Sequence, residues 1–348
     1  MTSRAERDTR SARLLGILVL LVILWPTSAS AHGINGLAES DYLVEITSTP
    51  DLPGVTVRTI ETGARIELIN EAPYSVEVLG YSGEPYAEIR PDGVYLNRMS
   101  PAPYLNETDG GGPPPSFASA AATPQWLKAS DEPRLRWHDH RAGWMGRQPP
   151  PHVQDDPQLR HRVLDWTVPL RVGTNVHFVH GHVDWIPPPD TAVWTAGVLM
   201  LAACVTASAL STVGRRWVAP VLIALAGGAA VADAVGRATT AADYDVPWFL
   251  VLITAEAWPA LAGLASLAAA GYALTRKPGA DLAWGVAGAA TALMAGVSRF
   301  GGFTSSITPT PWDGDVTRLL VLIALGVGTG LAAATLVSAR RPRDTASE

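Results

Sequence analysis

Histidine is the residue type in this sequence with the clearest capacity for chemistry. All eight histidines lie between His32 and His182, although the chain has 348 residues. An imidazole nitrogen is the commonest side-chain ligand for transition metals, and it changes charge near neutral pH. Metal binding is therefore expected in the first half of the chain.

The first candidate ligand is His32. Four arginines, an apolar core over Leu14–Trp25 and the small-residue run Ala29-Ser30-Ala31 precede it, an order typical of a secretory signal peptide over residues 1–31. Cleavage after Ala31 would make His32 the first residue, and its free amine and imidazole would chelate copper, which favours nitrogen donors. An uncleaved anchor, or a terminus that starts with histidine by chance, is the alternative.

The second candidate is the run Trp137–Arg141, followed by Met145. In an extended segment His138 and His140 point the same way, and Met145 could supply a soft sulfur ligand. The alternative is a stacked, hydrogen-bonded knot that fixes a loop onto the fold. The knot is the favoured interpretation, because the arginines of this segment oppose the binding of a second cation.

The third candidate lies at the end of the histidine-containing half. Strand periodicity places His180, His182 and Asp184 on one face, and two imidazoles with a carboxylate can hold a metal. The favoured alternative is that these residues form the solvent-exposed face of an edge strand close to a membrane. His152 and His161 are interpreted as solvated surface residues.

Composition and motifs exclude several classes of function. The net charge is −6, with no basic stripe and no nucleic-acid motif, so we expect no nucleic-acid partner. No nucleophile elbow, phosphate loop or zinc-protease helix occurs, so we predict that the chain is not an enzyme. The one cysteine, Cys204, leaves the exported half without disulfides, and a hydrophobic core must hold it together.

The elements that position these histidines are predicted to be short strands within residues 32–190. Apolar and polar residues alternate with a period of two, and turn residues such as Pro91-Asp92-Gly93 separate the runs. The pattern predicts an antiparallel sandwich with loops over Gly110–Thr123 and Gly146–Pro157. The expected strands are Ala64–Asn70, Tyr74–Tyr81, Tyr86–Arg90, Val94–Asn97, Leu164–Val172 and Val179–Trp185.

The composition becomes strongly apolar after Pro187–Asp190, and residues 191–339 are predicted to form five membrane helices. Basic residues follow the first, third and fifth segments, which places those ends and the tail 340–348 in the cytoplasm. The sheet domain would then lie outside. The predicted helices are Thr191–Val213, Trp217–Val235, Trp248–Leu274, Leu282–Val297 and Leu319–Val337.

Few charges occur within these apolar segments. Glu256 lies deep in the third segment, and an intramembrane carboxylate is a functional candidate by default, although it could be a neutral group bonded to a neighbouring helix. Pro259 is expected to kink the helix there. Asp233 and Arg237 have the spacing of a local ion pair, and Arg299 is expected to snorkel to the outer interface.

Two resemblances follow from these motifs. The order of signal peptide, His-first domain, Gly83–Tyr86, Pro91–Tyr95, Trp137–Arg141 and membrane tail resembles an uncharacterised family of actinobacterial exported membrane proteins. The chain is also similar to copper-resistance proteins of the CopC type, exported β-sandwiches whose mature chain begins with a copper-binding histidine. His32 and the fold class carry that similarity, whereas the Asp-x-His pair of those proteins is absent.

Together these features predict an Ig-like or cupredoxin-like sandwich followed by five helices in a multi-pass plasma-membrane protein. The expected function is copper handling at the outer face through His32, helped by His138 and His140. Its expected partners are the lipid bilayer and other envelope or copper-handling proteins. The alternatives are a metal-free structural or interaction module of the envelope, and a transporter or sensor that uses Glu256.

Overall fold

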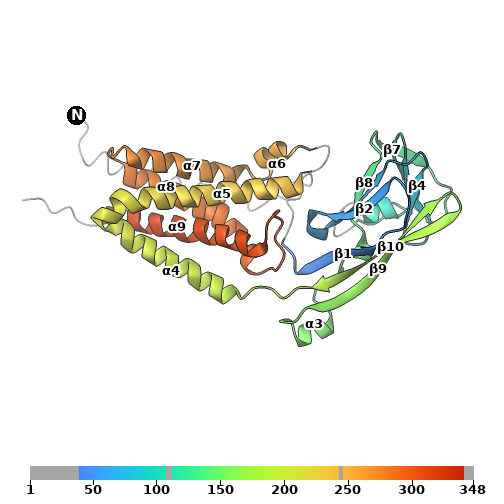
Figure 1. Ribbon diagram of the computed structural model, residues 1–348, viewed down its shortest axis with the longest axis horizontal. Coiled ribbons are helices and arrows are strands. Elements are labelled where there is room, and N and C mark those ends of the chain that lie inside the picture. The colour runs from blue at the N-terminus through green and yellow to red at the C-terminus, as the bar shows by residue number, and fades with distance from the viewer. Residues whose placement is uncertain (1–38, 107–111, 243–245, 341–348) are drawn as a thin grey trace, which may run out of the picture. The chain divides into compact units, whose positions relative to one another are not determined.

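The computed structural model describes residues 39–106, 112–242 and 246–340. The predicted signal peptide, His32 and the tail beyond Arg340 lie outside the described residues. A sheet-rich region comes first and a helical region follows it (Figure 1).

The sheet-rich region contains two antiparallel sheets. The larger has the order β1-β10-β9-β4-β5-β6-β7 and the smaller has the order β2-β3-β8. The strands are β1 (Tyr42–Ser48), β2 (Val55–Ile60), β3 (Arg65–Asn70), β4 (Val76–Leu79), β5 (Pro85–Arg90), β6 (Gly93–Asn97), β7 (Trp126–Ser130), β8 (Arg134–Trp137), β9 (His161–Val172) and β10 (Asn175–Trp185).

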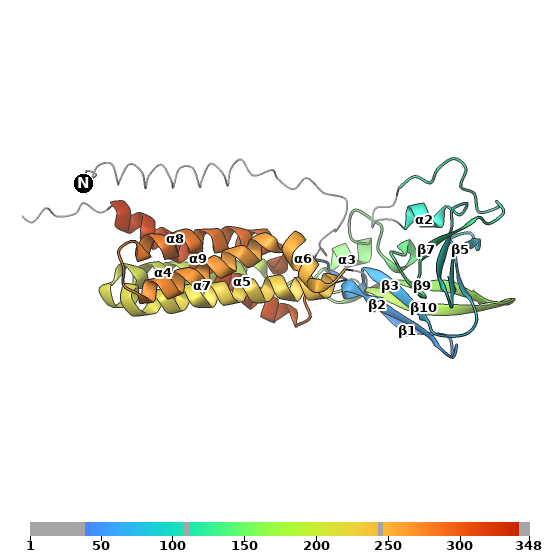
Figure 2. The same cartoon turned by 90° about the horizontal axis from the view of Figure 1, so that it is seen from above.

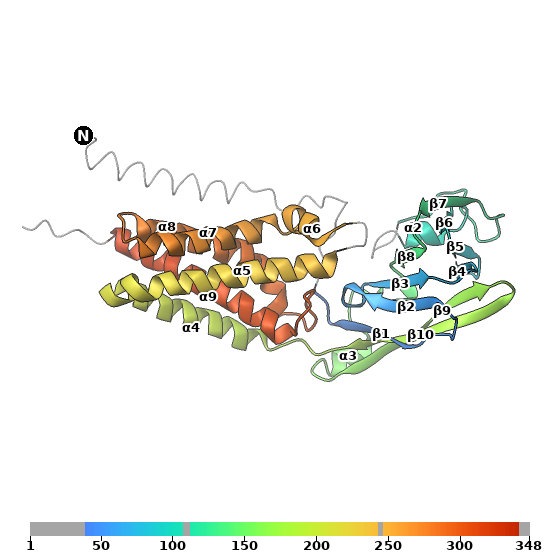
Figure 3. The same ribbon diagram turned by 45° about the horizontal axis from the view of Figure 1, so that its top comes forward.

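The longest element of the larger sheet is the hairpin of β9 and β10 (Figure 3). Its register pairs Val172 with Asn175, so only two residues form the turn. Gly173 adopts a φ of +59° there, the left-handed conformation that two-residue hairpin turns favour. β1 lies along the other side of β10.

Side chains from both sheets meet in one hydrophobic core. Ile66 and Leu68 of the smaller sheet are buried in the same cluster as Val168 and Leu170 of the larger one. Alternate residues of these strands point inward, as the period-two pattern predicts. The antiparallel, sandwich-like architecture is therefore confirmed, together with the six predicted strands, whose bounds shift by a few residues.

Three local predictions were wrong. β10 is not an edge strand, because β1 and β9 flank it. The run Trp137–Arg141 is not extended throughout, since β8 ends at Trp137 and His140–Ala142 form a 3-10 turn capped by the Asp139 carboxylate. The predicted loop after Gly146 contains a short helix, α3 (Pro151–Asp155), which starts with the proline that suits a first helical turn.

The helical region contains five helices long and apolar enough to cross a membrane, matching the five predicted segments. Figure 2 shows them running side by side. The first, α4 (Thr191–Leu210), starts where the Asp190 carboxylate accepts the Ala192 backbone N–H at 2.9 Å. The other four spans contain α5 (Ala219–Ala241), α7 (Ala257–Leu274), α8 (Ala280–Thr291) and α9 (Gly314–Arg340), and the short helix α6 (Trp248–Thr254) lies before α7.

Three of the segments are not regular helices, and the second segment starts as a π turn, Gly214–Val218. The third breaks between α6 and α7, one turn before the kink expected at Pro259. Proline has no N–H to donate to the carbonyl four residues earlier, which here is Ala255, so the helix is interrupted at that carbonyl. The fourth continues beyond α8 as a π turn, Ala292–Gly296, and a 3-10 segment, η5 (Val297–Phe303), which bring Arg299 into the span.

Small residues allow α5 and α7 to approach closely. A Cβ atom on Gly227 would lie 2.7 Å from the carbonyl oxygen of Gly263, much closer than normal contact. Gly228, the next residue, is exposed, and a Cβ atom there would meet nothing within 4 Å. Close helix packing through glycine is therefore specific to one face of α5.

The two adjacent glycines allow a matched test. We expect Gly227→Ala to destabilise the chain by about 1–3 kcal/mol through overpacking against the α7 backbone. Gly228→Ala should be neutral or stabilising by up to about 1 kcal/mol, because alanine favours helix. Thermal unfolding of the full chain in detergent measures both, and equal effects of the two variants would contradict this packing.

Candidate functional site

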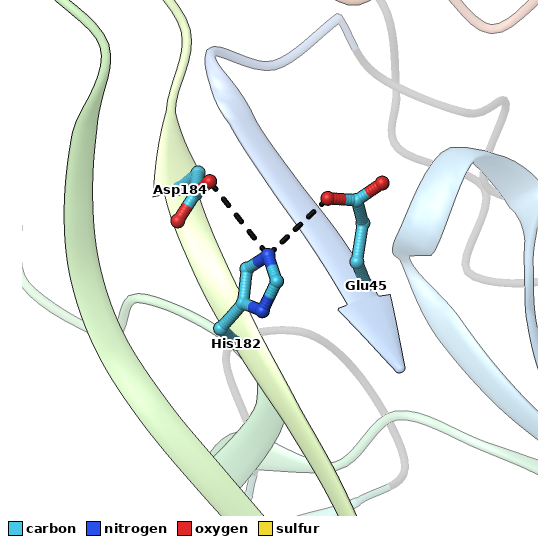
Figure 4. A group of neighbouring side chains, drawn as sticks. All are labelled: Glu45, His182 and Asp184. Atoms are coloured by element: carbon cyan, nitrogen blue, oxygen red, sulfur yellow. Dashed lines mark hydrogen bonds and ion pairs between the residues drawn. The ribbon is translucent and has the colours of Figure 1, made fainter. Parts of the chain in front are cut away.

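Three side chains of the larger sheet form a candidate metal centre. Glu45, His182 and Asp184 each offer one ligand atom, and these atoms all lie within 4.8 Å of one another (Figure 4). In the part of the chain that the structure describes, no other trio of His, Cys, Asp or Glu meets this distance.

The pairing of β1 with β10 brings these residues together. Glu45 lies opposite His182 in the register, and Asp184 is two positions farther along β10. The residues between them, Val44 and Val183, point into the core. Because strand side chains alternate, burying the valines sends the three polar side chains to the opposite face.

The two carboxylates converge on one imidazole nitrogen. His182 Nε2 lies 3.2 Å from Glu45 Oε2 and 3.7 Å from Asp184 Oδ2. Among the described residues, the other ring nitrogen, Nδ1, is buried without a hydrogen-bond partner. An unsatisfied buried polar atom costs about 1–3 kcal/mol, so Nδ1 of this ring contributes no stabilising hydrogen bond to the fold.

Two arginines already bind the Asp184 carboxylate. Arg160 donates to Oδ2 from Nε at 2.9 Å and from Nη2 at 2.7 Å, and Arg162 donates to Oδ1 at 2.5 Å. Burial opposes ionisation of Asp184, but the hydrogen bonds from Arg162 and Arg160 outweigh it and hold the pKa of this carboxyl below its ordinary value. The site therefore presents an ionised carboxylate at neutral pH.

Arg160 is the cation that a metal ion at this site would have to displace. Its side chain is 54% exposed, and its Nη2 also lies 3.4 Å from Glu45 Oε2. The guanidinium thus bridges the same two carboxylates that a metal ion would bridge. The exposed Arg160–Glu45 contact contributes about 0–1 kcal/mol, whereas at Asp184, only 6% exposed, an incoming dication must replace a stronger charge-assisted pair.

The sequence indicated only part of this cluster. His182 and Asp184 share the site as expected, but the Nδ1 of His180 pairs instead with Thr167 Oγ1 at 3.0 Å. Glu45 was missed, although it stands between Val44 and Ile46 in an alternating run that indicates a strand. Its pairing partner, 137 positions away, could not be found from that local pattern.

The Trp137–Arg141 run forms the knot that was the favoured interpretation. The Trp137 indole donates to the buried Asp139 carboxylate at 2.9 Å, and the Arg141 guanidinium donates to the same carboxylate twice at 2.8 Å. Arg141 also donates to the carbonyl of Leu79 at 3.2 Å, which fixes the turn onto β4.

The predicted ligands of this run have separate surroundings. His138 Nδ1 lies 2.9 Å from the Ala64 carbonyl, and its Nε2 accepts from Arg65 at 3.2 Å. The His140 ring lies beside Tyr81, and the Met145 side chain is half exposed. His152 and His161 were expected to be separate, solvated surface residues. That prediction was wrong in one respect, because their rings contact each other, with the ring centroids 5.7 Å apart.

A second cluster of charges lies at the helices. Arg237 Nε is 3.3 Å from Asp233 Oδ2 on the same helix, which confirms the predicted local pair. Arg299 does not snorkel as expected: it is mostly buried, pairs with Glu256 and reaches Asp233 Oδ2 at 3.5 Å. Arg237 Nη2 also donates to Glu39, which precedes β1, at 2.6 Å.

The irregular parts of the helices supply two members of this cluster. Glu256 stands in the break between α6 and α7, and Arg299 stands in η5, directly after the π turn. Interruptions of this kind accompany functional sites in membrane helices, where they present ionisable groups inside a bundle. The candidate residue Glu256 therefore belongs to a network rather than standing alone.

In comparisons with known proteins, no family model, no curated protein and no solved structure matches this chain. Function has therefore to be inferred from the chemistry of these two clusters.

The knot leads to a testable pH dependence. Burial, followed by the nearby Asp139 charge, raises the pKa of Tyr81 to about 12 from the model-compound value of 10.0. A raised tyrosine pKa stabilises the fold below pH 10, and this contribution is lost as the pH rises toward 12. At pH 11 Tyr81 should still be mostly neutral.

Tyrosinate absorbance of the wild type and of Tyr81→Phe at pH 11 measures this directly, with circular dichroism confirming that both remain folded. We expect equal absorbance, because the tyrosine removed was not ionised. An excess of about one tyrosinate in the wild type would contradict the buried position of Tyr81 beside Asp139.

Proposed function

We propose that the chain is a multi-pass plasma-membrane protein whose sheet domain lies outside the cytoplasm and binds copper(II) at Glu45, His182 and Asp184. The sheet domain is assigned to the Ig-like or cupredoxin-like sandwiches. The observation that carries the proposal is the convergence of two carboxylates on His182 Nε2, with all ligand atoms within 4.8 Å.

The donor set selects the class of ion. One imidazole nitrogen and two carboxylate oxygens suit divalent first-row metals, and among these copper(II) binds most tightly in the Irving–Williams order. The trio contains no sulfur ligand, so copper(I) is disfavoured at this position.

Arg160 gives the site a means of release. Its guanidinium lies 3.4 Å from Glu45 Oε2 and 2.7 Å from Asp184 Oδ2, where it neutralises both carboxylates. Metal binding would displace Arg160 toward solvent, while Arg162 keeps one oxygen of Asp184 in place. A site whose own cation competes with the metal suits an ion that is held and passed on, and no catalytic role is proposed.

The charges of the loops that follow the helices support the proposed location of the sheet domain outside the cytoplasm. Arg215 and Arg216 follow α4, and Arg276 and Lys277 follow α7, so these ends are assigned to the cytoplasm. The sheet domain precedes α4 and is assigned to the opposite side, where the predicted signal peptide would deliver it. The metal would then be bound at the outer face of the membrane.

A second function, proton-linked transport or sensing, is favoured by the network of Asp233, Arg237, Glu256 and Arg299. Asp233, Arg237 and Glu256 are buried and Arg299 is mostly buried, and all four lie within or directly beside helices that are apolar enough to cross a membrane. Such groups are expensive to maintain in a bilayer and usually serve ion or proton movement.

Titration of the purified full chain with copper(II), followed by electron paramagnetic resonance, tests the proposed metal site. His182→Ala should weaken binding at least tenfold, because even loss of a supporting outer-shell group costs about 10–100-fold. His180→Ala is the matched control on the same strand and should bind as the wild type does. Affinity should fall as the pH is lowered, since protons compete for the ligands.

Two further variants distinguish copper binding at this site from copper binding elsewhere in the chain. Arg160→Gln should raise the affinity for copper(II) by about tenfold, because it removes a competing positive charge next to both carboxylates. Binding that survives His182→Ala but is lost in His32→Ala would place copper at the amino terminus and contradict the proposal. Absence of copper(II) binding in the wild type would do the same.

A further inference from the structure

The charges of the helix network do not balance once Glu39 joins them. Asp233 and Glu256 are matched by Arg237 and Arg299, but Glu39 adds a third carboxylate, 2.6 Å from Arg237 Nη2. If every carboxylate is ionised, the network therefore has a net charge of −1. Asp233, Arg237 and Glu256 are each no more than 5% exposed, so water can do little to compensate this charge.

Asp233 is the least compensated of the three carboxylates. Its Oδ2 is reached only at 3.3 Å by Arg237 and at 3.5 Å by Arg299, and each guanidinium makes its shorter contact with a different carboxylate. Among the described residues, the other oxygen, Oδ1, is buried with no hydrogen-bond partner.

The position of Asp233 makes this deficit expensive. Asp233 lies about two turns before the end of α5 at Ala241, or about 12 Å along the helix at 1.5 Å per residue. An uncompensated buried carboxylate is expected to take up a proton rather than remain charged.

We propose that Asp233 is a proton-binding site of the helix bundle and holds a proton at neutral pH while Glu39 is bound to Arg237. A proton is favoured over a divalent metal ion because one added positive charge brings the network from −1 to neutral, whereas two would leave an excess positive charge beside two buried guanidiniums. A metal also needs several oxygen ligands, whereas a proton needs one lone pair, and Asp233 Oδ1 supplies it.

The proton determines which ion pairs the network makes. With neutral Asp233, Arg299 is left to Glu256 and Arg237 to Glu39, the contacts observed here. With ionised Asp233, both guanidiniums are drawn toward a third carboxylate, and their hold on Glu39 and Glu256 weakens. Arg318 of α9 takes no part, since it donates to the carbonyls of Gly302, Ser305 and Ser306 and to Asp315.

Glu39 links this equilibrium to the sheet domain. The next residue, Ser40, pairs with Ile307 by backbone hydrogen bonds, and the Asp41 carboxylate accepts from the Ser306 backbone at 2.7 Å. β1 starts directly afterwards at Tyr42. Release of the proton would loosen the Glu39 contact and so change how the start of β1 is held, which makes Asp233 the proton sensor of the bundle.

Carbon-13 labelling of aspartate carboxyls in the full chain, reconstituted in lipid nanodiscs at pH 7 without added metal, tests this proposal. We expect one protonated side-chain resonance in the wild type and none in Asp233→Asn. Asp281→Asn should keep the resonance. It is a matched control, because Asp281 is a half-exposed aspartate at the start of α8, paired with Arg215.

Glu39→Gln gives a second test that leaves Asp233 in place. Removing the third carboxylate balances the remaining charges and frees Arg237 for Asp233, so the protonated resonance should disappear. The proposal is overturned if no protonated aspartate is present at pH 7, if the resonance survives in Asp233→Asn or Glu39→Gln, or if glutamate labelling places the proton on Glu256.

Discussion

The antiparallel pairing of β1 with β10 is the constraint on which most of the proposed chemistry depends. It buries Val44 and Val183 on one face of the sheet and places Glu45 beside His182 on the other. Because side chains alternate along a strand, a slip of one residue in this register would exchange the two faces. The hydrophobic core therefore fixes the position of the polar cluster.

Arginine has different consequences in the two charged clusters. At the sheet, Arg160 is half exposed and bridges two carboxylates that could bind a metal instead, so it acts as a replaceable cation. At the helices, Arg237 and Arg299 are largely buried. Moving either of them away would leave a buried carboxylate without its ion-pair partner in an apolar medium. The first arrangement favours exchange of an ion with solvent, and the second favours a change of protonation.

Local periodicity accounts for what could be predicted from the sequence. The strand that contains His182 and Asp184 was found because alternation is visible in adjacent residues, and the five helices were found because their length and hydropathy are local properties. Glu45 was missed because its partner is 137 positions away, and no local pattern encodes that pairing. The buried pairing of Arg299 was missed because a π turn and a 3-10 segment extend its span beyond a regular helix.

The most direct measurement of the central claim is anomalous X-ray diffraction at the copper edge from crystals of the full chain soaked in copper(II). We expect an anomalous peak between Glu45, His182 and Asp184, with the Arg160 guanidinium moved away from Asp184. A peak elsewhere, or the arginines still bound to Asp184 with no metal beside His182, would contradict it.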